Sequence, residues 1–282
     1  MIYININSDF KYSLDKLKVS FFFSDIKYVE GVASDLLTQA NYFNARYKVQ
    51  YESNALTKCK RSFLVQCLEG NVYIGFEPNW LSERGRSART VILEYNPNKV
   101  KLSEVKRLLE FPFKAREIDF MSVDIAVDMD CVELSDLVVK KWDNRVKYVD
   151  FGSSDVETKY LGAIGHNHIK IYNKALEQKI KDIVWTRFEI TLKKVGKYMN
   201  FEIPPFHLPK LYNRNFQSSL IFEQLDNKDK FYFYSYLNNP ELLQLLNFRT
   251  RKRVLSLVDD YLSEVVISES EIRSVLKRYK FE

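Results

Sequence analysis

The segment Ile118–Met129 (IDFMSVDIAVDM) constrains the fold more than any other part of this 282-residue chain. Its β-branched and apolar residues predict a long strand. Because side chains alternate along a strand, Asp124 and Asp128 lie on one face, while Val123, Ile125 and Val127 lie on the other. One face of the predicted sheet therefore belongs to a core, and the other carries two carboxylates about 7 Å apart.

Other segments of the chain repeat this pattern of strands and helices. Helices are expected over 24–37, 103–109, 132–139 and 173–181. Further strands are expected over 16–23, 62–68, 71–76, 89–95, 145–149, 159–162, 168–172 and 184–192. A strand, a helix and several antiparallel strands thus occur twice. We predict an α+β domain with an antiparallel sheet, helices on one face and two similar halves, 1–100 and 101–208.

The character of the sequence changes after the prolines at 204, 205 and 209. Pro240 is placed to begin a helix, and residues 242–265 carry apolar side chains at helical spacing. Ser268 and Glu271 form a capping box for a last helix over 272–279. We therefore predict that the α+β domain ends at residue 208 and that 209–282 form a helical C-terminal region.

Several classes of protein are excluded by what the sequence lacks. No apolar run approaches the ~20 residues that span a bilayer, and the N-terminal residues have no signal or transit features, so we expect a cytoplasmic protein with no membrane partner. The three cysteines include no Cys-x-x-Cys pair, which argues against a disulfide framework and a thiolate zinc site. The phosphate-binding, dinucleotide-binding and serine-hydrolase motifs are all missing.

The net charge of +6 is concentrated in one part of the chain. Between Lys170 and Lys197 there are eight basic residues and three acidic ones, and a second basic cluster lies in the C-terminal region. Basic clusters in a chain with 15% aromatic residues are typical of nucleic-acid binding, where phosphates meet cations and bases stack on rings. The residues expected to contact DNA phosphates are Lys170, Lys193, Lys194, Arg249, Arg251, Lys252 and Arg253.

A third carboxylate lies in the strand predicted over 184–192, where Arg187 and Glu189 share a face. Together with Asp124 and Asp128, Glu189 could bind Mg²⁺ or Mn²⁺, hard cations that prefer carboxylate oxygens. The alternatives are that the carboxylates lie on a solvent-exposed face of the sheet or pair with basic side chains across it. Arg187 is then either the ion-pair partner of Glu189 or a cationic contact for a phosphate.

Tyr172 is the first candidate for a nucleophile, since Lys170 and Lys174 flank it and neighbouring cations favour the phenolate. Tyr160 is the second candidate. The alternative for either tyrosine is simple packing. His166 and His168 are expected to be exposed loop residues rather than metal ligands.

Four motifs, taken in order, resemble the replication initiation factor family of rolling-circle plasmid and phage initiators and related conjugative relaxases. They are VDIAVD (123–128), YLG (160–162), IKIYNK (169–174) and WTRFEI (185–190), and the resemblance extends over residues 90–193, including LEYNPNK (93–99). It implies that a tyrosine attacks single-stranded or extruded origin DNA, assisted by a carboxylate-bound divalent metal, and leaves a 5′-phosphotyrosine and a free 3′-OH. Position by position, it implies that Tyr172 is the nucleophile and that Lys174 and Arg187 contact phosphate. The implied metal ligands are Asp124, Asp128 and Glu189.

The sequence departs from this family pattern at two places. Residues 163–165 (Ala-Ile-Gly) replace a turn that is commonly rich in serine and arginine, and Lys170 stands where arginine is usual, which loses a bidentate phosphate contact. Two functions are therefore compatible with the resemblance: a DNA nicking and joining initiator, or a non-catalytic origin-binding initiator or repressor. The latter would recruit a host helicase or polymerase, and a homodimer is compatible with both. A scaffolding protein without a nucleic-acid role is the third alternative.

Overall fold

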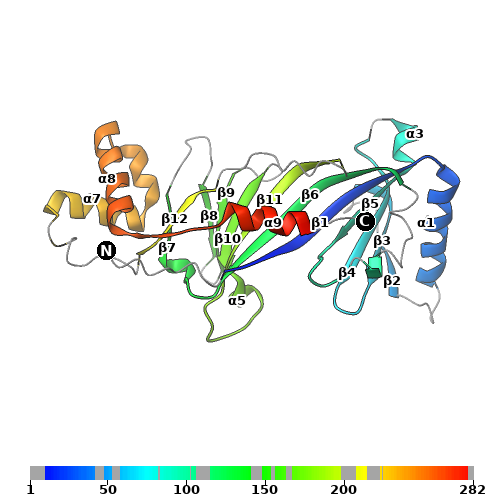
Figure 1. Ribbon diagram of the computed structural model, residues 1–282, viewed down its shortest axis with the longest axis horizontal. Coiled ribbons are helices and arrows are strands. Elements are labelled where there is room, and N and C mark those ends of the chain that lie inside the picture. Colours follow the sequence, from blue (N-terminus) through cyan, green and yellow to red (C-terminus); the bar gives the residue numbers. More distant parts are fainter. Residues whose placement is uncertain are drawn as a thin grey trace.

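The computed structural model describes residues 10–41, 48–52, 58–81, 83–101, 103–105, 115–140, 148–153, 156–162, 167–197, 208–214, 223 and 225–278. These residues form an α+β structure around a ten-stranded antiparallel sheet (Figure 1). The predicted fold class is thereby confirmed.

The two halves of the chain contribute five strands each to the large sheet, in the order β2-β3-β4-β5-β1-β6-β11-β10-β9-β8. In each half the first strand pairs with the last, β1 with β5 and β6 with β11, and β1 and β6 pair with each other at the centre. The halves therefore have the same strand order, related by an approximate twofold axis. The strands are β1 (Lys11–Phe23), β2 (Lys48–Glu52), β3 (Cys59–Gln66), β4 (Asn71–Pro78), β5 (Thr90–Tyr95), β6 (Ala115–Met129), β8 (Tyr148–Ser153), β9 (Val156–Leu161), β10 (His168–Asn173) and β11 (Thr186–Lys197).

Short helices occupy matching places in the two halves. The helix α3 (Arg84–Ser87) connects β4 to β5, and α5 (Lys174–Glu177) connects β10 to β11. The longer helix α1 (Ile26–Asn41) follows β1, but the helix expected at 132–139 was a wrong prediction. That segment forms a 3-10 turn, η3 (Leu134–Asp136), and a strand, β7 (Leu137–Lys140), because β7 pairs with a strand far along the chain. Of the helix expected over 103–109, residues 103–105 are helical and the rest lie outside the described residues.

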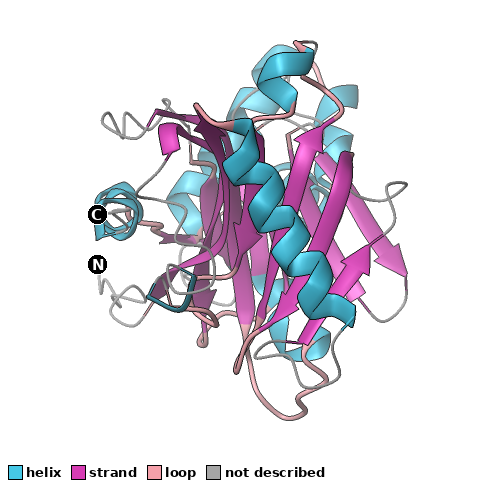
Figure 2. Cartoon of the chain, turned by 90° about the vertical axis from the view of Figure 1, so that its right-hand side faces the viewer, coloured by secondary structure: helices cyan, strands magenta, loops and turns pink. Residues whose placement is uncertain are grey.

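One face of the sheet carries the main hydrophobic core. Alternate residues of the two central strands, such as Val19 and Ile125, are fully buried there. Side chains of α1, which lies across the strands in Figure 2, join the same core. So does α9 (Glu269–Arg278) through Ile272 and Leu276, and the backbone N–H of Glu271 donates to the Ser268 hydroxyl at 3.2 Å as the capping box predicts.

The C-terminal region contains strands as well as the predicted helices. A three-stranded sheet has the order β13-β12-β7, and Tyr212 and Val138 on it pack against helices through a second core that includes Phe233 and Val258. No helix in the described ranges has the length and apolarity needed to cross a membrane. The elements of this region are β12 (Lys210–Asn213), α7 (Asn227–Asn238), η5 (Pro240–Leu245), α8 (Phe248–Tyr261) and β13 (Ser263–Val265).

Candidate functional site

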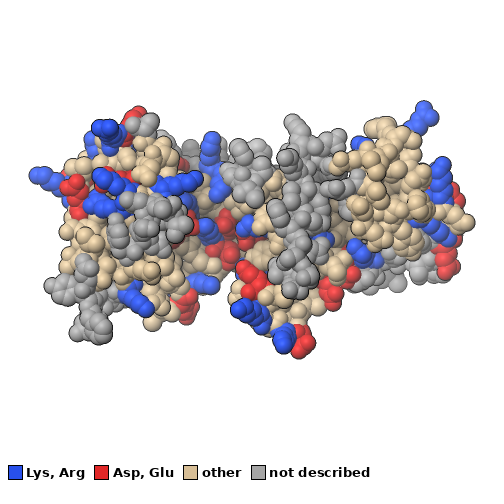
Figure 3. Space-filling view, turned by 180° about the vertical axis from the view of Figure 1, so that it is seen from behind, with Lys and Arg blue, Asp and Glu red and all other residues tan. Residues whose placement is uncertain are grey.

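Polar side chains from neighbouring strands gather on the side of the sheet opposite the main core, which we call the polar face. In the strand register Glu189 of β11 stands between Ala126 of β6 and Lys170 of β10, and Lys170 stands opposite Tyr160 of β9. Asp124 stands opposite Thr191 in the next row. Figure 3, which views the molecule from behind Figure 1, shows acidic and basic side chains together near its centre. Alternation along each strand, predicted from the sequence, brings these residues together.

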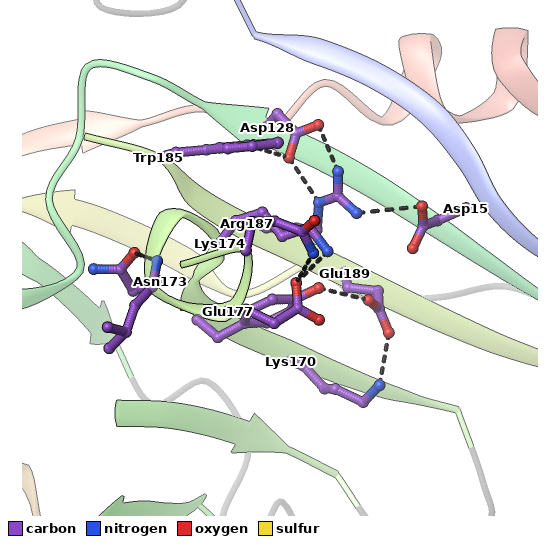
Figure 4. A network of polar contacts seen from close by, with 12 residues as sticks. Asp15, Asp128, Lys170, Asn173, Lys174, Glu177, Trp185, Arg187 and Glu189 are labelled. Atoms are coloured by element: carbon purple, nitrogen blue, oxygen red, sulfur yellow. Dashed lines mark hydrogen bonds and ion pairs between the residues drawn. The ribbon is translucent and has the colours of Figure 1, made fainter. Parts of the chain in front are cut away.

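Glu189 is the centre of the candidate site. Its side chain is 7% exposed, and its two oxygens are used by different partners. The Lys170 ammonium donates to Oε1 at 2.7 Å (Figure 4). The Tyr172 hydroxyl donates to Oε2 at 3.2 Å. The carboxylate thus lies between a cation and a phenol, a position from which it can accept the phenol proton.

The surroundings of Tyr172 raise the pKa of its phenol well above the usual value. Burial is the main cause, and the charge of Glu189 adds to it. The reasoning that flanking lysines favour phenolate was wrong, because both ammonium groups have carboxylate partners. Lys170 binds Glu189, while Lys174 binds Glu177 and lies 5.7 Å from the centre of the Tyr172 ring. Tyr172 is therefore a phenol at neutral pH and needs a base to act as a nucleophile.

Arg187 lies in the next row, where it is held on two sides by carboxylates. Its Nε and Nη2 donate to the two oxygens of Asp128 at 2.7 and 2.9 Å, and its Nη1 is 3.2 Å from Asp15 (Figure 4). The indole N–H of Trp185 also donates to Asp128, at 2.7 Å. Burial opposes the charge of Arg187, but the hydrogen bonds and charge of Asp128 outweigh it and raise the pKa of the guanidinium. Of the two predicted roles, an ion pair is the one seen, with Asp128 and not Glu189 as the partner.

The three carboxylates predicted to bind a metal are divided between two networks. Asp128 belongs to the Arg187 network, whereas Asp124 and Glu189 interact with each other. Burial and the charge of Glu189 raise the pKa of Asp124, against a hydrogen bond with Thr191. Within the described ranges, no group of three or more histidine, cysteine, aspartate or glutamate side chains is placed to hold a metal ion. The Mg²⁺ or Mn²⁺ site remains a prediction. Both oxygens of Glu189 and of Asp128 already have protein partners, so Asp124 is the carboxylate that remains for it, and Mg²⁺ can be held by one or two carboxylates plus substrate phosphates.

The predicted phosphate contacts of the C-terminal region divide into two kinds. Arg251 donates to main-chain carbonyls at the end of η5, and Arg253 binds Asp229, so both have structural partners. Arg249 and Lys252 are exposed on α8. On β11, Lys193 is half-buried and Lys194 is exposed.

Some residues were misplaced or missed by the sequence analysis. His168 is buried in β10 rather than exposed in a loop, and His166 lies outside the described residues. Asp15, a partner of Arg187, was missed because it precedes the predicted start of the first strand. The pairing of β1 with β6 brings it to the site, and no local sequence pattern predicts that pairing.

Comparison with known proteins shows a distant likeness to a solved structure. No family model matches the chain, and a search of curated proteins found no similar sequence. Among solved structures, the chain is similar to one described as a rolling circle replication initiator protein from Geobacillus stearothermophilus. The match has a TM-score of 0.40 and 15% sequence identity, and covers 66% of this chain and 75% of that chain.

Proposed function

We propose that this chain is a DNA nicking and joining protein of the replication-initiator type, with Tyr172 as its nucleophile and Glu189 as the base. The contact that carries the proposal is the hydrogen bond from the Tyr172 hydroxyl to Glu189 Oε2 at 3.2 Å. A phenol with a raised pKa is a poor nucleophile alone, but a carboxylate already bonded to it can take its proton as it attacks.

The reaction is a transesterification in which one phosphodiester is exchanged for another. Tyr172 Oη would form a bond to the phosphorus, its proton would pass to Glu189, and the bond from phosphorus to O3′ would break. The products are a 5′-phosphotyrosine and, after protonation, a free 3′-OH, and the reverse reaction rejoins the strand. Lys170, whose side chain is 30% exposed, lies beside Glu189 with a charge that suits a phosphate oxygen.

A divalent cation would be held at this site chiefly by Asp124, so that Glu189 stays available as the base. Bound there, Mg²⁺ or Mn²⁺ would supply Lewis-acid stabilisation of the negative charge that develops on the phosphate. The raised pKa of Asp124 supports this assignment, because a cation would offset the burial and like charge that disfavour its ionised form. Arg187, with its fork occupied by Asp128 and its third nitrogen near Asp15, would position β6 and β11 rather than contact phosphate.

A second function is favoured by a separate observation. Tyr172 is only 8% exposed, and Asp128 and Glu189 both already have protein partners. A protein that binds its origin without cutting it, and recruits host replication proteins, would need neither a reactive tyrosine nor a metal. The basic side chains of β10, β11 and α8 would serve either function by contacting phosphates.

The two functions are separated by testing for a covalent adduct. Purified full-length protein is incubated with Mn²⁺ and a labelled single-stranded oligonucleotide from its replicon, and the products are run on a denaturing gel. We expect a shifted band for the wild type and Tyr160→Phe, none for Tyr172→Phe, and a band at least roughly 100-fold weaker for Glu189→Gln, in line with the loss of a general base. Loss of the band only in Tyr160→Phe would move the nucleophile to Tyr160. No band from the wild type, with tight DNA binding retained, would support the non-catalytic function.

A further inference from the structure

One hollow of the polar face lies in the first half of the chain. It is a pocket of about 200 Å³ between β1, β5, β6 and the segment that follows β4. None of the residues discussed above as catalytic or metal-binding lines it. Its main lining residues are Ser20, Phe22, Trp80, Arg86, Ile92 and Asp119.

The pocket occupies the place in the first half that the Tyr172 site occupies in the second. The Tyr172 site lies beside the start of β11, the strand that follows α5. The pocket lies beside the start of β5, the strand that follows α3. Both sites use alternate residues of the central strands on the same face. Asp119 at the pocket and Asp128 at the Tyr172 network are nine residues apart on β6, which corresponds to roughly 30 Å. One continuous strand surface thus joins the two sites.

Aromatic and guanidinium groups dominate the rim of the pocket. The Trp80 side chain is 43% exposed although it lines the pocket. The Phe22 ring lies 4.6 Å from the guanidinium of Arg86 and 6.0 Å from that of Arg89. The α3 segment thus brings two arginines, Arg86 and Arg89, to one aromatic ring at the pocket. Figure 3 shows basic side chains gathered at the end of the molecule that carries α3.

We propose that this pocket binds one unpaired base of the DNA strand that is cut at Tyr172, an inference that rests on the proposed function. A flat, exposed indole at the edge of a small pocket suits stacking with a base, an interaction that tolerates any base sequence. Arg89 supplies the charge that an adjoining phosphate requires. A pocket of this volume is small for a whole ligand but suits a single ring system.

The chemistry of the pocket wall favours a base that donates hydrogen bonds. Glu117 and Asp119 both line the pocket, and Glu117 is held by Arg86 at 2.9 Å. Carboxylates accept from the exocyclic amino groups of bases, as Glu and Asp do with cytosine, whereas thymine carries no such group. A phosphate placed inside the pocket would be repelled by these acids, and Arg86 is already paired with Glu117, so Arg89 is the anion contact.

The test measures binding of single-stranded oligonucleotides to the full-length protein carrying Tyr172→Phe, so that cutting does not interfere. The affinity for the intact strand is compared with the affinity for strands that carry a single abasic position. Each strand is tested with the protein that retains Trp80 and with the variants Trp80→Leu and Trp80→Phe. Leu68→Ala, at a residue that is 96% exposed in the turn between β3 and β4, serves as the control. We expect Trp80→Leu to weaken binding about tenfold, in line with the loss of one stacked base, and Trp80→Phe to weaken it much less.

The abasic scan identifies the base that the pocket holds. With Trp80 present, one abasic position within roughly nine nucleotides of the cut should weaken binding about tenfold, and with Trp80→Leu that position should have no further effect. Equal losses at every position, or the same abasic sensitivity in Trp80→Leu, would overturn the proposal. Binding of proteins or peptides at Trp80 without any effect on DNA would overturn it too. Since the readout is affinity and not the covalent adduct, failure of this proposal and failure of the Tyr172 assignment are seen in separate measurements.

Discussion

Replacing Asp128 with asparagine distinguishes an anchor for Arg187 from a metal ligand. In the structure the Asp128 carboxylate accepts two hydrogen bonds from the Arg187 guanidinium and one from Trp185. The introduced amide would keep one oxygen but turn an NH₂ group toward the other guanidinium nitrogen. Arg187 would then remain charged, with Asp15 at 3.2 Å as its other carboxylate partner. We therefore expect the Asp128→Asn protein to be less stable whether or not a metal is present.

The size of the loss follows from burial. Removing one partner of a buried ion pair costs about 3–5 kcal/mol, because an uncompensated charge stays buried. The Arg187 side chain is 8% exposed and that of Asp128 17%, but Asp15 and the retained oxygen compensate in part. We expect a loss of about 2–3 kcal/mol. At about 2–4 °C per kcal/mol for a chain of this size, Tm should fall by about 4–12 °C.

The assay is urea unfolding in EDTA, with and without added Mn²⁺, followed by far-UV circular dichroism. Asp130→Asn is the matched control, because Asp130 is exposed just beyond the end of β6 and should change stability by less than about 0.5 kcal/mol. A loss below about 0.5 kcal/mol for Asp128→Asn in EDTA would refute the anchor role. If Asp128→Asn lowered the unfolding free energy only in the presence of Mn²⁺, Asp128 would be assigned as a metal ligand.

Three further predictions concern the first half of the chain. Gly75→Ala should destabilise the protein by about 1–3 kcal/mol, because its Cβ would lie 2.6 Å from the Cys59 sulfur and 2.9 Å from the Tyr73 hydroxyl. By contrast, a Cβ at Gly31 in α1 would have no atom within 4 Å, so Gly31→Ala should stabilise the protein by about 0.5–1 kcal/mol. Thermal unfolding measures both variants, and equal effects on stability would contradict both values. The pKa of Glu94 is raised by burial and lowered by two lysines of β1. The lysines have the larger effect, so the pKa lies below the usual value. Its contribution to stability should be full above about pH 4.5 and lost as pH falls through the lowered pKa. The unfolding free energies of wild type and Glu94→Gln should therefore converge in acid, and a constant difference from about pH 7 to about pH 3 would be the contrary result.

Local alternation was enough to predict which side chains share a face. Asp124 with Asp128, and Arg187 with Glu189, are placed together because each pair lies in a long strand with one apolar face. The same reasoning predicted most strands of the large sheet. It was wrong for residues 132–139, where apolar spacing compatible with a helix was overridden by pairing of β7 with β12, which lies far along the chain at Lys210–Asn213.

The partners of each charged group could not be predicted from the sequence. Which carboxylate binds Arg187 depends on how β6 and β11 are aligned, and a shift of two residues would exchange Asp128 for Ala126. The effect of Lys170 on Tyr172 also depends on Glu189 lying between them. These are properties of register between strands, which periodicity within one strand does not contain.

The contact between α9 and β1 sets an order for folding during synthesis. The backbone N–H of Ser268, just before α9, donates to the Tyr12 hydroxyl of β1 across 256 residues of sequence. At about 5–20 residues per second, β1 waits roughly 13–50 s on the ribosome before the segment that covers it is made. During that interval the apolar side chains of β1 lack the part of their burial that α9 provides. The exposed apolar surface makes the nascent chain prone to aggregation and able to bind chaperones. The stability of β1 therefore depends on a segment that the ribosome makes 256 residues later.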